Sequence, residues 1–154
     1  MIAKDDYYMA IAKTVSLRSN CVGRSVGAVV VRGDRIVATG YNGTAGGLTN
    51  CLDGGCTRCA NRSLFPSGTA YDLCICVHAE ANAIASAARH GIALEGGTLY
   101  TTDQPCFSCA KELIQVGIAQ VFYLVPWTPD ERVAADYDIL QRALHATQRA
   151  DPSV

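Results

Sequence analysis

The feature that most constrains the fold of this chain is the stretch from residue 43 to residue 76. It is rich in Gly, Cys, Asn and Ser, and it shows neither the alternation of a strand nor the period of a helix. A compact domain rarely contains so long a segment without structure. Five of the 8 cysteines of the chain fall within it. We therefore expect a bound metal to hold this segment in place.

The compartment decides how the cysteines are interpreted. Residues 1–6 carry acids where a signal peptide would carry a cationic start and an apolar stretch. No apolar run reaches the roughly 18 residues that a membrane helix needs. We therefore expect a cytoplasmic protein without a membrane partner. Because the cytoplasm keeps thiols reduced, the cysteines are expected to be metal ligands rather than disulfides.

Length and charge narrow the possible functions. A chain of 154 residues suits a single domain, 1–154. With 49% hydrophobic and 18% charged residues, it is too apolar for a disordered protein. The net charge of -1 removes the simplest electrostatic case for binding a nucleic acid polymer. A small molecule is the more reasonable partner.

The order of the expected elements indicates an α/β fold. The pattern predicts helices at residues 5–18, 78–90, 106–116 and 130–148, and strands at 25–31, 35–41, 97–102 and 119–125. The short turn at residues 32–34 joins the first two strands as an antiparallel hairpin. Strands that then alternate with helices predict a layered sheet of mixed direction. The expected core face of the last helix comprises Ala134, Tyr137, Ile139, Leu140, Ala143 and Leu144. No further strand is evident after that helix.

Two short motifs carry the chemistry, and each stands at the start of an expected helix. The first contains His78 and Glu80, and the second contains Pro105, Cys106 and Cys109. One histidine and two thiolates are three good zinc ligands, and a three-ligand site leaves a position open for water, as in catalytic zinc sites. Zinc lowers the pKa of bound water to about 7. Glu80 can face the same cavity without binding the metal and act as a proton carrier.

Each motif alone is weak. A lone histidine at a helix start is usually a cap or core residue, and a lone Cys-x-x-Cys is often redox-active or merely buried. Together and in this order, with the proline in place, the two motifs match the H-x-E and P-C-x-x-C signature of zinc nucleobase deaminases.

The remaining cysteines favour a second metal site. Free cysteine is a good small core residue, which suits one or two of them but not Cys-x4-Cys-x2-Cys in a polar, glycine-rich segment. A thiolate-rich structural zinc is the better interpretation. Six candidates compete for four places, so the ligand set stays open, and a cluster of two metals stays open as well. The candidates are Cys21, Cys51, Cys56, Cys59, Cys74 and Cys76.

Longer stretches resemble one deaminase family. Residues 17–21, 38–44, 50–59 and 73–80 are similar to the deoxycytidylate (dCMP) deaminases, especially the fungal-type members. The resemblance covers roughly residues 8–125. It is specific because tRNA adenosine deaminases and cytidine deaminases share the zinc motif but lack this cysteine-bearing insertion. It implies a cytidine deaminase-like three-layer α/β/α fold with a mixed central sheet of four to five strands, and a homo-oligomer.

The resemblance also implies an activity, which is the zinc-dependent hydrolysis of dCMP to dUMP with release of ammonia. Zinc would be held by His78, Cys106 and Cys109, and Glu80 would move protons between water, the ring nitrogen and the leaving amino group. Some members carry a second zinc with ligands at positions that resemble Cys21, Cys51 and Cys76.

The expected substrate contacts are less specific. Asn42 resembles the nucleotide-contacting asparagine of the family, and the Ala79 backbone N–H is a candidate donor to the pyrimidine carbonyl. Arg24 is either a contact to a phosphate or regulatory nucleotide or a solvated surface arginine. Thr44 precedes the loop that we expect to border the phosphate.

That loop departs from the family pattern. After Thr44 the family usually has a proline, where this chain has Ala45-Gly46-Gly47. An alternative substrate is therefore a related or modified cytosine nucleoside or nucleotide in a specialised pathway. A non-catalytic nucleotide-binding zinc protein is a third hypothesis, which the presence of Glu80 and all three ligands disfavours.

Overall fold

The computed structural model describes residues 1–153. The helices are α1 (Lys4–Ser16), α2 (Thr57–Ala60), α3 (Ala79–His90), α4 (Phe107–Gln115) and α5 (Ala134–Ala143). The strands are β1 (Gly27–Arg32), β2 (Arg35–Tyr41), β3 (Gly43–Thr44), β4 (Cys76–Val77), β5 (Thr98–Asp103), β6 (Gln120–Val125) and β7 (Thr147–Gln148). Within this range, none of the helices is long and apolar enough to cross a membrane.

The central sheet is mixed, as the sequence predicts. Its strand order in the described residues is β2-β1-β5-β6-β7. Strand β1 runs antiparallel to both β2 and β5, whereas β5, β6 and β7 are parallel to one another. The β1–β2 pairing confirms the predicted hairpin.

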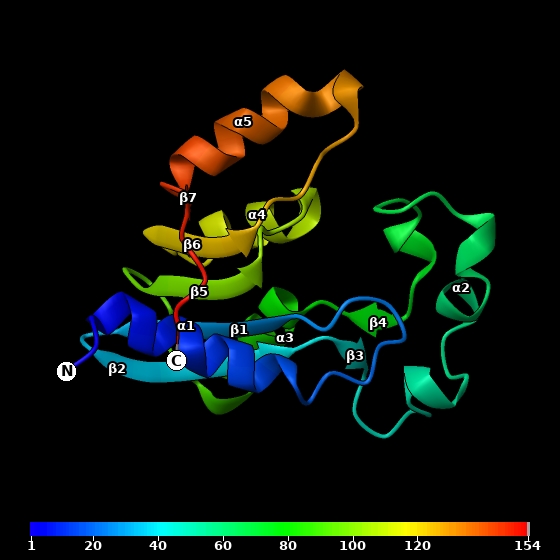
Figure 1. The fold of residues 1–154 in the computed structure, drawn as a ribbon, viewed down its shortest axis with the longest axis horizontal. Coiled ribbons are helices and arrows are strands. Elements are labelled where there is room, and N and C mark those ends of the chain that lie inside the picture. The colour runs from blue at the N-terminus through cyan, green and yellow to red at the C-terminus, as the bar shows by residue number, and fades with distance from the viewer. Residues whose placement is uncertain (154) are drawn as a thin grey trace.

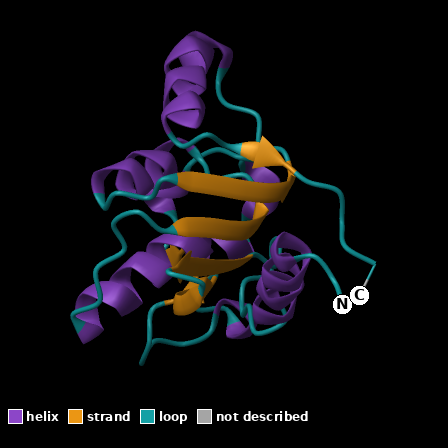
Figure 2. Cartoon of the chain, turned by 90° about the vertical axis from the view of Figure 1, so that its left-hand side faces the viewer, coloured by secondary structure: helices purple, strands orange, loops and turns teal. Residues whose placement is uncertain are grey.

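Helices cover both faces of the sheet, which confirms the expected three layers (Figure 2). The β-branched run of β1 supplies both faces because successive side chains of a strand point in opposite directions. Ala28 and Val30 pack in one core with α3 and α4, whereas Val29 and Val31 pack in the other with α1. The predicted strand is thus buried on both sides.

The last predicted helix is wrong in its extent. Helix α5 ends at Ala143, and His145 then adopts a φ of 46°, in the left-handed region that interrupts a helix. The chain continues into β7, which adds a fifth strand parallel to β6. This strand is only two residues long and both are exposed, so no alternation of apolar residues announces it.

The predicted core face of this helix is correct only in part. Tyr137 and Leu144 are buried and Leu140 is half-buried. Ile139 is 63% exposed, and Ala134 and Ala143 are exposed as well. Helix α5 packs on α4 at the end of the sheet and therefore buries a narrower stripe than a helix that lies across a sheet face (Figure 1).

Helix α3 lies close to β2 because Gly40 has no side chain. A Cβ at Gly40 would overlap the carbonyl oxygen of Ala79 in the first turn of α3. The Asn82 side chain adds a hydrogen bond from its Nδ2 to the Tyr41 carbonyl at 2.7 Å. The start of α3 is therefore fixed against the sheet.

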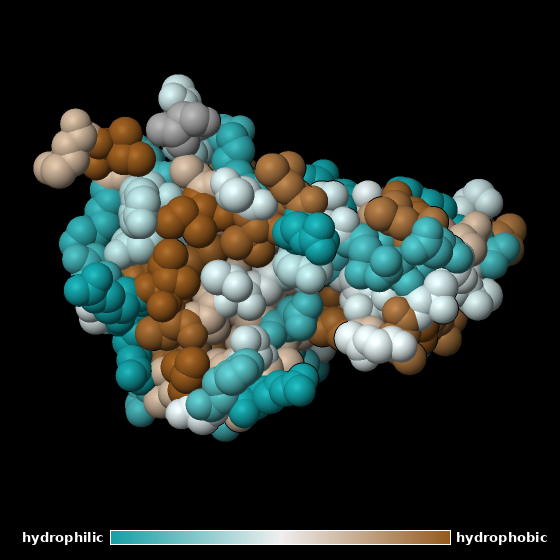
Figure 3. Space-filling model, turned by 90° about the horizontal axis from the view of Figure 1, so that it is seen from below, coloured by the Kyte–Doolittle hydropathy of each residue, from teal (hydrophilic) through white to brown (hydrophobic). Residues whose placement is uncertain are grey.

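Residues 45–75 form a lobe beside the sheet, at the right of Figures 1 and 3. Its backbone passes through short 3₁₀ turns and the helix α2 of 4 residues, which explains why the sequence shows no period here. The two-stranded ladder of β3 and β4 joins it to the rest of the chain, with Thr44 opposite Cys76. Its large exposed apolar side chains are Leu48, Leu52, Leu64, Leu73 and Ile75.

The close contact between Gly40 and α3 can be tested by adding one methyl group. We expect Gly40→Ala to lower the free energy of unfolding by about 1–3 kcal/mol, since the added Cβ forces α3 away from the sheet. Urea unfolding followed by circular dichroism measures this. Gly46→Ala is the control, because a Cβ there meets nothing within 4 Å. Equal stabilities of the two variants would contradict the packing argument.

Candidate active site

The two motifs with predicted zinc ligands lie at the starts of neighbouring helices. His78 is the residue before α3, and Cys106 is the residue before α4. Their carbonyl oxygens accept the first helical hydrogen bonds, from Asn82 N at 2.8 Å and from Ala110 N at 2.9 Å. Both helices pack on the same face of the sheet, so their positive N-terminal ends meet.

The three predicted ligands come together. The Nδ1 atom of His78 lies 3.4 Å from the Cys106 sulfur and 3.5 Å from the Cys109 sulfur. A tetrahedral zinc with ordinary Zn–N and Zn–S bonds requires about 3.5 Å between such donors. The donor set of one imidazole and two thiols therefore fits zinc, and it leaves one tetrahedral position open.

Of the two thiols of this trio, Cys106 favours the ionised form that binds metals, whereas the hydrogen bond to Cys106 and burial raise the pKa of Cys109. The Cys109 side chain hydrogen-bonds to Cys106 and lowers the pKa of Cys106 to about 4. The bond between Cys106 and His78 in turn raises the pKa of the imidazole. The site therefore carries a thiolate at neutral pH.

Glu80 lies in the first turn of α3 and is 4% exposed. Burial raises the pKa of its carboxyl to about 7. Glu80 lines the same cavity as His78 and Cys106, but it is not one of the three residues whose donor atoms lie close enough to share a metal. This arrangement fits a side chain that exchanges protons with a bound molecule rather than one that holds the metal.

The cavity lined by His78 and Cys106 has a volume of about 250 Å³, just below the roughly 300–1,000 Å³ of typical small-molecule sites. The edge of the Tyr71 ring packs on the His78 ring, with the centroids 4.8 Å apart. Sequence reasoning missed several side chains of the wall because no periodic pattern marks them. These are Arg58, Arg62, Phe65, Tyr71, Gln104 and Trp127.

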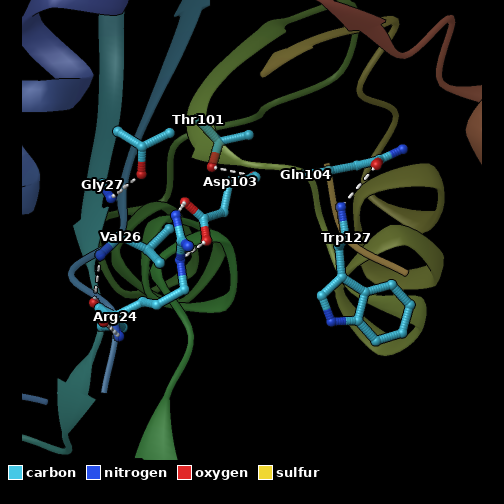
Figure 4. A network of polar contacts seen from close by, with 9 residues as sticks. Arg24, Val26, Gly27, Thr101, Asp103, Gln104 and Trp127 are labelled. Atoms are coloured by element: carbon cyan, nitrogen blue, oxygen red, sulfur yellow. Dashed lines mark hydrogen bonds and ion pairs between the residues drawn. The ribbon is translucent and has the colours of Figure 1, made fainter. Parts of the chain in front are cut away.

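Arg24 lies in the wall of this cavity, paired with an acid (Figure 4). Its Nε is 2.6 Å from Asp103 Oδ2, and its second nitrogen contacts the other carboxylate oxygen at 3.1 Å. At the other side of the view, the Trp127 backbone N–H donates to the Gln104 side chain at 3.0 Å. The pair with Asp103 neutralises Arg24, whose side chain is nevertheless 63% exposed.

Two of the other three predicted substrate contacts line the cavity. Asn42 and Ala79 are buried in the cavity wall. The Asn42 side chain accepts from Val26 N at 2.8 Å and donates to the Arg24 carbonyl at 2.7 Å, so it fixes the segment that carries Arg24. Among the described residues, Thr44 is not part of this cavity wall. It pairs with Cys76 in the β3–β4 ladder instead.

The remaining six cysteines form a second cluster, where the lobe joins the sheet. Their sulfurs fall into two overlapping sets, in each of which all atoms lie within 4.8 Å of one another. One set is Cys21, Cys51, Cys59 and Cys76. The other set is Cys56, Cys59, Cys74 and Cys76. The structure thus brings all six predicted candidates together.

Comparisons with known proteins agree with this site. Residues 2–125 match the family described as the cytidine and deoxycytidylate deaminase zinc-binding region. The deoxycytidylate deaminase of Schizosaccharomyces pombe is 43% identical over 131 residues, which is 85% of this chain and 40% of the relative. That of Mycobacterium phage D29 is 38% identical over 125 residues, which is 77% of this chain and 92% of the phage protein.

A solved structure extends the similarity to the fold. The dCMP deaminase of cyanophage S-TIM5, in complex with dCMP and dUMP, is 30% identical with a TM-score of 0.73. The match covers 97% of this chain and 99% of the phage chain. In contrast, this chain spans only about two fifths of the length of its two yeast relatives, at 40% and 39%.

Metal content tests the assignment of ligands. We expect His78→Ala to lower the zinc content of the purified protein by one equivalent per chain, because two thiolates alone hold zinc poorly. Glu80→Gln is the matched control and keeps the zinc of the parent. Plasma mass spectrometry after dialysis measures both. Loss of zinc from Glu80→Gln, or its full retention in His78→Ala, would contradict the assignment.

Proposed function

Since the chain belongs to the cytidine and deoxycytidylate deaminase zinc-binding family, we propose that it hydrolyses dCMP to dUMP and ammonia. One observation carries this proposal. The buried Glu80 stands beside the trio of His78, Cys106 and Cys109 in the wall of one small-molecule cavity. The S-TIM5 relative, described with dCMP and dUMP, supports a pyrimidine nucleotide as the substrate.

The residues divide the reaction between them. His78, Cys106 and Cys109 would hold zinc, which supplies Lewis-acid activation of water when bound. The Glu80 carboxylate takes a proton from the attacking water and delivers it to ring N3. The water oxygen bonds to C4, and the C4–N bond breaks after Glu80 passes the second proton to the amino group, which leaves as ammonia.

Two neighbours of this centre orient the base. The Ala79 backbone N–H belongs to the first turn of α3, where N–H groups have no helical partner, and it is proposed to donate to the pyrimidine carbonyl. Asn42 holds the backbone around Arg24 and keeps one amide hydrogen for the nucleotide.

The phosphate is proposed to bind the arginines of the cavity. Arg58 is the strongest of them because its Nε is buried with no hydrogen-bond partner among the described residues. Its guanidinium is held 5.7 Å from the Phe65 ring centroid and 5.6 Å from that of Tyr71. Arg62 and the original candidate Arg24 lie in the same wall. Thr44, the last residue of β3, is retained as a weaker candidate because it precedes the loop expected to border the phosphate.

The wider setting also belongs to the proposal. We place the reaction in one catalytic domain of residues 1–154, in a homo-oligomer and in the cytoplasm. All eight cysteines are free, which suits a reducing compartment. We further propose that the second cysteine cluster holds zinc in a structural role, distinct from the zinc of the trio.

Deamination assays test the reaction. We expect ammonia release from dCMP at a higher kcat/KM than from CMP, deoxycytidine or cytosine. Glu80→Gln is expected to lower kcat by about 10²–10⁴-fold, the usual contribution of a positioned acid–base group, while its zinc content is unchanged. Full activity of Glu80→Gln would refute the mechanism. Reaction of non-phosphorylated substrates alone would favour the alternative, a deaminase of a related or modified cytosine nucleoside.

The role of Arg58 is tested by comparing substrates within one variant. We expect Arg58→Gln to lower kcat/KM for dCMP by about 10–100-fold, the value of a hydrogen bond to a charged group, and to leave deoxycytidine hydrolysis unchanged. Arg89→Gln, at an exposed position near the end of α3, serves as the control. An equal loss on both substrates would mean that Arg58 only supports the fold.

A further inference from the structure

The cysteine cluster beside the lobe contains more sulfur than one metal can use. Its six cysteines come from segments that are far apart in the chain, and the two sets of four share Cys59 and Cys76. Each set has the four thiols of a closed structural zinc site. Neither set alone accounts for all six side chains.

The spacing of the sulfurs suits shared metal coordination. The Cys74 sulfur lies 3.6 Å from the sulfurs of both Cys56 and Cys59. Four thiolates around one tetrahedral zinc are about 3.8 Å apart. A disulfide, in contrast, requires about 2.05 Å.

Backbone N–H groups donate to two sulfurs of the other set of four cysteines. Val22 N donates to the Cys51 sulfur at 3.5 Å, and Gly23 N donates to the Cys21 sulfur at 3.4 Å. Such donors stabilise the negative charge of a thiolate that ligates a metal, and they orient it. Both thiols belong to the set that lacks Cys56 and Cys74, so each half of the cluster shows features of a site.

The lobe has little else to hold it together. Its buried hydrophobic centre consists of Cys51, Cys56 and Cys59, and Val22 is the one partly buried hydrophobic side chain other than cysteine that packs against them among the described residues. The large apolar side chains of the lobe, such as Leu52 and Leu64, are exposed instead. Metal–sulfur bonds therefore have to replace the hydrophobic core that orders an ordinary segment.

We propose that the cluster binds two zinc ions bridged by the thiolates of Cys59 and Cys76. Cys21 and Cys51 complete the tetrahedron of one ion, and Cys56 and Cys74 complete that of the other. Six thiolates and two Zn²⁺ ions leave a net charge of −2. Arg58, between two of the ligands in the sequence, and Arg62 bring positive charge to the same segment.

Two zinc ions give all six thiols a ligand role, which a single ion does not. A single zinc in the first set would leave the buried thiol of Cys56 and the half-buried thiol of Cys74 beside an anionic tetrathiolate without a ligand role. A single zinc in the second set would leave Cys21 and Cys51, although each of them receives a backbone N–H. With two ions every sulfur is a ligand and both sites are closed.

This cluster also borders the cavity of the trio. Cys21, Cys59, Cys74 and Cys76 lie in the cavity wall together with His78. The two ions thus hold the wall that carries Arg58, but the inference does not depend on which substrate the cavity accepts.

Metal counting and cadmium NMR on the full chain test the proposal. We expect three zinc equivalents per chain in the parent and two in His78→Ala, in which only the trio is broken. After exchange with ¹¹³Cd, His78→Ala should give two tetrathiolate resonances with mutual scalar coupling, because a shared sulfur connects the two nuclei. The readout is independent of activity, so a failure of the proposed reaction would leave it unaffected.

Other results would overturn the binuclear cluster. The first is a single zinc equivalent in His78→Ala. The second is no zinc in that variant, together with intramolecular disulfides found by mass mapping. The third is two cadmium resonances that show no mutual coupling. Cys74→Ser adds a check that spares the bridging positions. It should remove one of the two cluster metals and abolish the coupling while the cadmium in the first set remains, and retention of both metals would refute the assigned ligands.

Discussion

The start of α3 is the position on which both candidate metal-binding groups of this protein depend. Gly40 lets the first turn of the helix approach β2 until backbone nearly touches backbone, and Asn82 ties the same turn to the strand. Residues 76–80 run through this point. Cys76 belongs to the cysteine cluster, His78 belongs to the trio, and Glu80 lines the cavity. A shift of the helix would therefore disturb three kinds of contact together.

Charge balance explains how the Glu80 carboxyl can be buried beside the thiols of Cys106 and Cys109. Two thiolates and a buried carboxylate without a cation would carry three negative charges in one small volume, which costs several kcal/mol per ion. A zinc ion with two thiolates and a neutral imidazole carries no net charge. Asp103 in the same cavity wall is paired with Arg24, so Glu80 is the acid left to exchange protons, and its burial keeps its proton affinity high enough for it to both take and give a proton.

The sequence allowed the trio, the hairpin and the layer order to be predicted because each rests on local patterns. His78 and Cys106 precede helices whose starts are marked in the sequence, and β1 is a continuous β-branched run. Strand β7 was missed because two exposed residues carry no alternation. Ile139 was assigned to the core because periodicity gives the apolar face of a helix but not how much of that face a neighbour covers.

Arg58 and Arg62 of the cavity wall were missed for a different reason. Helix α2, which carries Arg58, has 4 residues, far too few to be stable by itself in water. Its position follows from Cys56 and Cys59 at its two ends, which belong to the cluster. The direction of Arg58 is therefore set by the assembly of cysteines from distant segments, a long-range constraint that no local pattern reveals. The trio is proposed to position the reacting end of a bound nucleotide, and the cysteine cluster positions the wall proposed to recognise its phosphate.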